Sequence, residues 1–439
     1  MQLVPRKEPR RFLLLSLTIY THLWIVEGAL RKWIPVLADG LYVLRDITLI
    51  AMIFFAFAVY GKFGKYSALA VFVWASAFLL ATYVFVQIIA GLVSLPIGIF
   101  GLRNYLAPFL ALFLVWRAEL IDYLPLAARI IAHYAPFQFL LVVAQVNSPV
   151  SGLLNAEVGG EETIFTTAFG VARASGTFSA PAGLIAYVTL AIGVAIFMIN
   201  DKGRYGKLTA WSSFISAVGI LVIAGSRGAV FAGAIVVLAW LAYGLAHGRI
   251  RTFATLLLGA LVGAGLFVFI ARQLPEVVAA FGARFENAAQ NEDTLRRVQG
   301  GIFNFFSVPL TPFGDGAGSH STIGISLGST LPWVEGDSAR WVSELGILGL
   351  VLATIRIFVF LAMGTWIVWA IRRETISTLI LTAILLPVGL AGSISTSPST
   401  QGFFSIAGGM LLASILPPCS TEAKSNLAQT FPTQLSGLE

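Results

Sequence analysis

The amino-acid sequence predicts an all-α membrane protein that crosses the bilayer many times, and three observations support this fold class. Hydrophobic residues make up 57% of the 439 residues and only 11% are charged, whereas soluble domains contain about 25% charged residues. The mean hydropathy is +0.86. Apolar runs of about 20 residues, which are long enough to cross the hydrocarbon core as helices, recur along the chain. We therefore expect residues 1–416 to form a single transmembrane bundle.

The apolar runs predict about twelve transmembrane helices. The first run follows a basic N-terminus and resembles a secretory signal, but it lacks a small-residue cleavage site, so we expect a retained helix. The sequence contains no visible internal repeat. The expected helices cover residues 12–27, 41–60, 66–91, 103–116, 124–145, 180–199, 209–225, 227–246, 252–271, 342–370, 376–393 and 401–416.

Basic residues in the short connections predict the orientation of the bundle, because such residues are enriched on the cytoplasmic side. With a cytoplasmic N-terminus, the short cytoplasmic connections hold Arg6, Lys7, Arg10, Arg11, Lys62, Lys65, Arg117, Lys202, Arg204, Lys207, Arg249, Arg251, Arg372 and Arg373. Both termini are then cytoplasmic, and residues 417–439 are expected to be a disordered cytoplasmic tail. Two larger connections, at about 146–179 and 272–341, lie outside. The second is too long for a turn and too polar for lipid, so it is expected to fold over the outer face.

Charge and motif content narrow the function classes. The net charge of +7 is spread over short connections, which does not indicate a nucleic-acid partner. The single cysteine, Cys419, gives no disulfide framework, and the four histidines show no metal-ligand spacing. No dinucleotide fingerprint, P-loop or acidic metal motif is present, so no cofactor is expected. The cytoplasmic connections are too short to hold a sugar-nucleotide site.

Arg227 is the most informative single residue, because it lies between two apolar stretches in LVIAGSRGAVFAGAIVVLAW. A charged group there is costly, and its guanidinium fork suits a phosphate or pyrophosphate at the membrane face. A helix-end anchor that extends to the interface is the alternative interpretation. The expected outer-face cations are all arginine except one: Arg31, Lys32, Arg45, Arg103, Arg173, Arg227, Arg272, Arg284, Arg296, Arg297 and Arg340. This bias indicates a bound anionic group, with ion pairing to external acids as the alternative.

Other polar residues near the expected outer face have less specific interpretations. Arg103, in FGLRNYLAPF, is expected to open the fourth helix from outside, where it can face the same cavity as Arg227. Glu344 either caps the start of the tenth span or lines the cavity. Arg356 lies deeper in that span and is expected to pair with a polar group of the bundle. His320 is the only external histidine, and it is either solvated or catalytic.

Four segments together carry a family resemblance: SGTFSAPAGLIAYVTLAI (175–192), LVIAGSRGAVFAGAIVVL (221–238), RRVQGGIFNFFSVPLTPFGDGAG from Arg296, and VEGDSARWVSELGILGLVL. The last contains E-x-G-x-x-G at Glu344, Gly346 and Gly349. In order, spacing and sidedness the segments resemble the O-antigen ligase and polysaccharide polymerase superfamily, well over roughly residues 170–355 and elsewhere by helix count and topology. The resemblance implies a bundle that transfers glycan from polyprenyl pyrophosphate, in the outer leaflet of the bacterial inner membrane, to an acceptor.

One departure from the family pattern bears on the reaction. Ligases of the family usually carry a histidine about nine positions before the closing glutamate, often as His-Asn, whereas this chain has Glu335, Gly336 and Asp337 there. The departure favours polymerisation of repeat units over ligation to lipid A core. The ligase, and a polysaccharide or lipid transporter or flippase, remain alternatives. A transporter more often has broken helices and related halves, and does not need an external loop of about 70 residues.

The resemblance and the residue chemistry together suggest candidate site residues. An acceptor hydroxyl loses its proton as it attacks the anomeric carbon, and the candidates for this base are Glu335, Asp337 and His320. For the two acids, pairing with Arg340 or Arg296 alone is the alternative. The candidates for binding the leaving pyrophosphate are Arg227, Arg296, Arg103 and Arg297. Expected partners are the lipid-linked glycan, membrane lipids and a chain-length regulator, with no nucleic acid and no metal.

Overall fold

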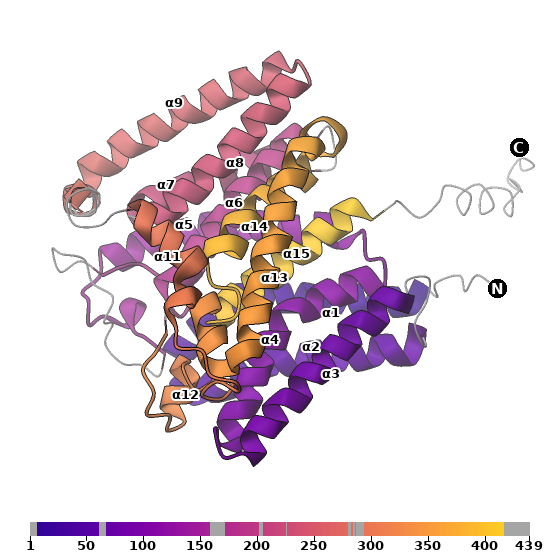
Figure 1. The fold of residues 1–439 in the computed structure, drawn as a ribbon. Coiled ribbons are helices and arrows are strands. Elements are labelled where there is room, and N and C mark those ends of the chain that lie inside the picture. Colours follow the sequence, from indigo (N-terminus) through magenta and orange to yellow (C-terminus); the bar gives the residue numbers. More distant parts are fainter. Residues whose placement is uncertain are drawn as a thin grey trace, which may run out of the picture.

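The computed structural model describes residues 7–60, 67–158, 172–201, 205–224, 226–279, 282–283, 286, 294–334 and 336–416, so the predicted tail at 417–439 lies outside the described residues. The long helices form one bundle (Figure 1): α1 (Lys7–Trp33), α2 (Ala38–Tyr60), α3 (Ser67–Ile89), α4 (Leu95–Arg117), α5 (Tyr123–Val146), α6 (Pro181–Asn200), α7 (Lys207–Ala224), α8 (Arg227–Ala246), α9 (Ile250–Gln273), α13 (Asp337–Arg373), α14 (Ile376–Ala391) and α15 (Pro398–Ile415). Short helices lie in the connections: η1 (Pro35–Leu37), η2 (Leu153–Asn155), α11 (Thr294–Phe303), η3 (Asn304–Ser307) and α12 (Thr322–Ser326).

The helix lengths and compositions confirm an all-α polytopic membrane protein. Within the described ranges, nine helices are long and apolar enough to cross a membrane, namely α1, α3 to α9 and α13. Shorter apolar helical segments cover Ile47–Ala56, inside α2, and Ile376–Ala391, which is α14. The predicted count of about twelve is therefore not confirmed.

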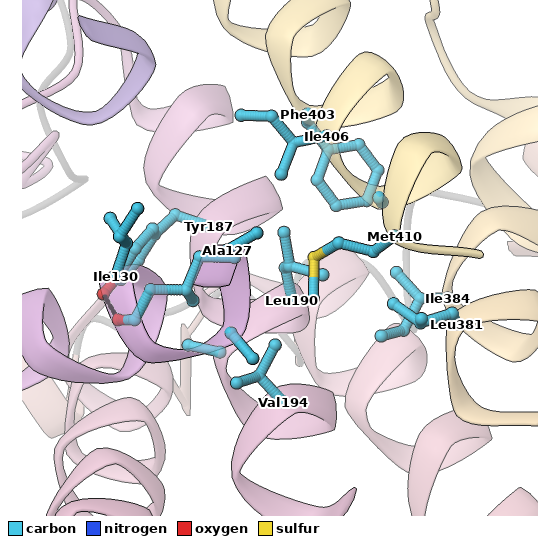
Figure 2. Close-up of a cluster of buried hydrophobic side chains, with 14 of the residues drawn as sticks. Ala127, Ile130, Tyr187, Leu190, Val194, Leu381, Ile384, Phe403, Ile406 and Met410 are labelled. Atoms are coloured by element: carbon cyan, nitrogen blue, oxygen red, sulfur yellow. Dashed lines mark hydrogen bonds between the residues drawn. The ribbon is translucent and has the colours of Figure 1, made fainter. Parts of the chain in front are cut away.

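The core of the bundle surrounds α6. In α6, 78% of the most apolar window is buried, against 11% in α3 and in α9. Figure 2 shows Tyr187 and Leu190 of α6 packed among side chains of α5, α14 and α15, including Ile384 and Met410. The Tyr187 hydroxyl donates to the Ile131 carbonyl at 2.7 Å, so its one polar atom is satisfied inside this core. Helices α3 and α9 therefore form the lipid-facing rim.

The fourth helix begins earlier than predicted. It starts at Leu95 rather than at residue 103, with Pro96 in its first turn, where proline needs no backbone hydrogen bond. Gly101 lies inside this helix. Its lack of a side chain lets the backbone of Ala317 approach closely, since a Cβ there would lie 2.4 Å from the carbonyl carbon of Ala317. Arg103 consequently does not open the helix but lies about two turns inside it.

Helix α13 is a hairpin rather than one continuous helix, so the start of the predicted span at 342–370 is wrong. Gly346 has φ 58° and ψ −127°, which interrupts the helix. The Asp337 Oδ2 atom lies 3.6 Å from Arg356 Nη1, although a straight helix would separate these residues by roughly 28 Å. Residues 337–345, the short arm, thus fold back on residues 347–373, the long arm.

Both glycines of the G-x-x-G step are needed for this reversal. A Cβ at Gly346 would lie 2.2 Å from the Thr311 carbonyl oxygen, and its positive φ disfavours any other residue. A Cβ at Gly349 would lie 1.8 Å from the Trp341 carbonyl oxygen. Gly346 therefore makes the turn and Gly349 lets the two arms touch.

Candidate functional site

A network of buried charged side chains lies along the hairpin. Asp337, Arg340 and Glu344 come from the short arm, and their spacing of three and four residues places them on one face of its helix. Arg356 comes from the long arm. Each of these four residues is at most 5% exposed. Charges buried in this way require partners, because isolated charges are very costly in a low-dielectric interior. These four residues are called the charged network below.

Asp337 fastens the hairpin to the segment between α14 and α15. Its carboxylate accepts hydrogen bonds from the Ile394 amide, from the Ser395 amide at 3.1 Å and from the Ser395 hydroxyl at 2.9 Å. It also forms ion pairs with Arg340 at 3.2 Å and with Arg356 at 3.6 Å. Both oxygens are engaged and the residue is buried, so this predicted base lies where a structural role, rather than contact with an acceptor, is favoured.

Arg356 caps the C-terminal end of α14. Its Nε atom donates to the Gly389 carbonyl at 2.6 Å, and Nη2 donates to the carbonyls of Val388, at 3.2 Å, and Gly392. The last carbonyls of a helix lack intrahelical partners and carry partial negative charge, so a guanidinium there is favourable. These contacts confirm the expectation that Arg356 pairs with polar groups of the bundle.

Glu344 organises the loop at residues 314–321. Its carboxylate accepts the Tyr105 hydroxyl at 2.5 Å and the backbone amides of Gly318, at 2.7 Å, and His320, at 3.2 Å. The Arg340 Nε atom lies 3.9 Å from the same carboxylate. Glu344 therefore holds the loop against the short arm, and it does not begin a membrane span as the sequence suggested.

The loop at 314–321 is wedged between α3, α4 and the short arm. Gln87 of α3 donates to the Glu344 carbonyl at 2.8 Å and accepts from the Ala317 amide at 3.0 Å. Gly318 has φ 84°, and a Cβ there would lie 2.6 Å from the Ile97 carbonyl oxygen of α4. The glycine content of this loop thus follows from close backbone packing.

His320 and Asp315 form a pair at the edge of the charged network. The two ring nitrogens of His320 face acceptors, with Nδ1 2.8 Å from the Pro332 carbonyl oxygen and Nε2 2.8 Å from Asp315 Oδ2. The Pro332 carbonyl can only accept, so the Nδ1 atom donates in that contact. The His320 side chain is 6% exposed, whereas that of Asp315 is 46% exposed. Sequence reasoning missed Asp315, and its place in the GDG turn was the only signal.

The helices that bear three of the predicted arginines converge on the hairpin. Arg227 is the first residue of α8, which follows the N-cap Ser226. Arg296 and Arg297 lie near the start of α11, and their side chains lie outside the described part of the structure. Both α8 and α11 pack against α13 and α14. These arginines thus belong to helices that pack against the two helices joined by the charged network.

Arg103 is connected to the charged network through neighbouring amides. Its Nη1 atom donates to the Asn104 side-chain oxygen at 2.8 Å. Gln401 donates to that same oxygen at 3.0 Å and to the Ser395 carbonyl at 3.1 Å, and Ser395 is the residue that binds Asp337. Glu335, a further predicted base, lies outside the described residues.

Other cations of the predicted outer-face set are engaged within the fold. Glu27 pairs with Arg45 at 3.0 Å and with Arg31 at 3.4 Å. Lys32 donates to the Ser175 hydroxyl at 2.9 Å and to the Gly176 carbonyl at 2.8 Å. Local pairing therefore explains part of the arginine bias without a bound anion.

The SGTF segment is a buried turn that leads into α6. Gly176 has φ 58°, and a Cβ there would lie 2.4 Å from Gln138 Oε1. Phe178 is buried, with its ring 5.4 Å from that of Trp24. This motif fixes the position of α6 in the core, and it lies against α1 and α5 rather than in the charged network.

Comparisons with known proteins add no relative: no family model, curated protein or solved structure matches this chain. In the part of the chain that the structure describes, no group of three or more His, Cys, Asp or Glu side chains is arranged to hold a metal ion. Any functional interpretation therefore depends on the charged network and on the motif residues joined to it.

Proposed function

We propose that this chain is an integral-membrane glycosyltransferase of the bacterial inner membrane that polymerises repeat units of O-antigen or exopolysaccharide. Its substrate is a glycan linked to polyprenyl pyrophosphate at the periplasmic or extracellular face. The observation behind the proposal is the charged network, because it joins the glycine-rich loop, Glu344 and the G-x-x-G hairpin of the family resemblance in one place. Ionisable groups buried in a membrane bundle are functional-site candidates by default.

The proposed reaction is a single displacement. An acceptor hydroxyl attacks the anomeric carbon, a glycosidic bond forms, and the bond to the pyrophosphate oxygen breaks with its electron pair leaving on polyprenyl pyrophosphate. This inverts the anomeric centre. We assign Arg227 and Arg296 to the leaving diphosphate, with Arg103 and Arg297 as further contacts. The packing of both α8 and α11 against the hairpin supports this assignment, and the loss of one such preorganised donor typically costs about a hundredfold or more in rate.

Asp315 is the best-placed described carboxylate for the base. Its side chain is 46% exposed, it borders the charged network, and only its Oδ2 atom contacts His320. The acceptor proton passes to this carboxylate as the hydroxyl attacks. His320 is then a positioning residue, fixed by the Pro332 carbonyl. In the same scheme Asp337 positions the hairpin.

Surface glycans of a deletion strain test the proposed function. Single repeat units on the normal acceptor are the expected result and identify a polymerase. Full-length chains left on the lipid carrier would instead identify a ligase. Lipid-linked units trapped in the inner leaflet would identify a flippase, and unchanged surface glycans would exclude all three.

Substitution of Arg227 tests the diphosphate assignment. The R227A variant is expected to insert normally and to lose polymer, and R227K is expected to rescue poorly because lysine cannot form the bidentate contact. R372A, an exposed change at the far end of the long arm, is the control. Normal polymer from R227A would remove Arg227 from the site.

Substitution of Asp315 tests the base. In proteoliposomes supplied with extracted lipid-linked glycan, D315N is expected to stop the release of polyprenyl pyrophosphate. H320Q is expected to lower kcat while leaving KM for the lipid-linked glycan unchanged, since it disturbs only the position of the base. D122N, at an exposed ion pair with Arg10, is the control. Wild-type turnover by D315N would place the base elsewhere.

A further inference from the structure

Large apolar side chains are exposed on a segment that is not a membrane span. From the last residue of α11 to the glycine-rich loop, Phe303 is 49% exposed, Phe306 72%, Leu310 54% and Phe313 50%. None of these residues belongs to a candidate membrane span in the described chain. Apolar patches of this kind are rare on surfaces that face only water, and they mark interaction sites.

The same segment is anchored on its other side. Phe305 is 2% exposed and belongs to a buried cluster with Tyr105 and Trp341, whereas its neighbour Phe306 points outward. The backbone there is turned as the 3-10 helix η3, with the Ser307 hydroxyl donating to the Asn304 carbonyl at 2.6 Å. One face of the segment therefore packs against the protein, and its other face is apolar and exposed.

This apolar face continues the lipid-facing surface of α3. The Phe313 ring stacks on Tyr83 of α3, with centroids 5.9 Å apart. The Tyr83 hydroxyl donates to the Pro312 carbonyl at 3.0 Å, and Gln87 donates to the Phe313 carbonyl at 2.6 Å. Just beyond Tyr83, Phe85 is 57% exposed on the rim helix α3. The exposed apolar surface of α3 thus adjoins residues 312–313 directly.

We propose that residues 303–313 form a membrane-interface anchor, which places Phe303, Phe306, Leu310 and Phe313 among the acyl chains of the bilayer leaflet next to the C-terminal end of α3. Segments with one apolar face and one anchored face bind at the boundary between headgroups and acyl chains. The anchor holds the adjoining loop at 314–321 close to the membrane surface. This inference does not depend on the proposed glycosyl transfer.

Spin-label accessibility tests the anchor in the full chain. In a C419S background, a nitroxide is attached at F306C or F313C in vesicles of phosphatidylethanolamine and phosphatidylglycerol. The accessibility to oxygen, relative to that to a water-soluble nickel chelate, is then measured. F78C, on the exposed face of α3, gives the lipid standard, and S151C, in an exposed connection, gives the water standard.

The expected ratio at residues 306 and 313 is severalfold above that of S151C and close to that of F78C. A ratio equal to that of S151C would overturn the proposal. Shielding that appears only at high protein-to-lipid ratio, together with dipolar broadening between labels, would assign the face to a second copy of this chain and would also overturn it. F303C repeats the test should either first variant elute as aggregate.

Discussion

Replacement of Gly349 by alanine is expected to destabilise the hairpin of α13. The added Cβ would lie 1.8 Å from the Trp341 carbonyl oxygen, whereas real Cβ contacts are essentially never shorter than 3.0 Å. The two arms must therefore separate by about 1.2 Å, because the atoms that the Cβ meets belong to the backbone and cannot rotate away. Overpacking of this kind costs about 1–3 kcal/mol, and the separation also stretches the contact between Asp337 and Arg356.

The matched control is Gly364 on the same arm. A Cβ there would meet the Leu386 side chain at 3.7 Å, an ordinary contact, so G364A keeps only the gain of about 0.5–1 kcal/mol that alanine brings to a helix. Both substitutions bring this gain, so the two variants should differ in free energy of unfolding by the clash cost alone, about 1–3 kcal/mol. Unfolding by SDS in mixed micelles, followed by tryptophan fluorescence, measures the difference. Equal stability of G349A and G364A would refute the close approach of the arms.

Two further predictions concern the charged network and the turn before α6. R356M should lower the free energy of unfolding by about 1–3 kcal/mol, because it removes one of the two guanidiniums paired with Asp337 and leaves carbonyls at the end of α14 without their donor. Adding D337N should recover part of the loss, and strictly additive effects in this double-mutant cycle would contradict the coupling of Arg356 and Asp337. G176A should lower the free energy of unfolding more than G248A does. Both glycines have positive φ, but a Cβ at Gly176 would clash with its neighbours, whereas a Cβ at Gly248 would have nothing within 4 Å. Equal losses in the same unfolding assay would show that backbone strain alone matters.

Run length and composition predict the membrane helices well, because the bilayer imposes a minimum length on any span. The predicted helix at 227–246 agrees with α8, Arg227–Ala246. The predicted start at residue 103 leaves out the first two turns of α4, which include Gly98 and Gly101. Their tolerance depends on tertiary neighbours, such as Ala317, that lie far away in the sequence.

The hairpin was not predictable from local pattern. VSELGILGLVL reads as continuous apolar helix, and the reversal at Gly346 depends on Thr311 and on the pairing of Asp337 with Arg356. For the site, charge and chemistry were enough to single out Asp337 and His320 as notable. The hydrogen-bond partners of these two residues were not predictable. The partners include Ser395 for Asp337 and Pro332 for His320, and no spacing rule connects these residues.

The partners of Asp337 impose an order on biogenesis. During synthesis, the nascent chain exposes Asp337 and Arg356 well before Ile394 and Ser395 leave the ribosome. Until α14 and the residues after it have been synthesised, the guanidinium of Arg356 lacks the three carbonyls to which it donates. The carboxylate of Asp337 likewise lacks its backbone amide donors. Before the C-terminal helices dock, the hairpin therefore holds its buried charges by the ion pairs within α13 alone, and a chain that ends after the long arm never gains the remaining partners.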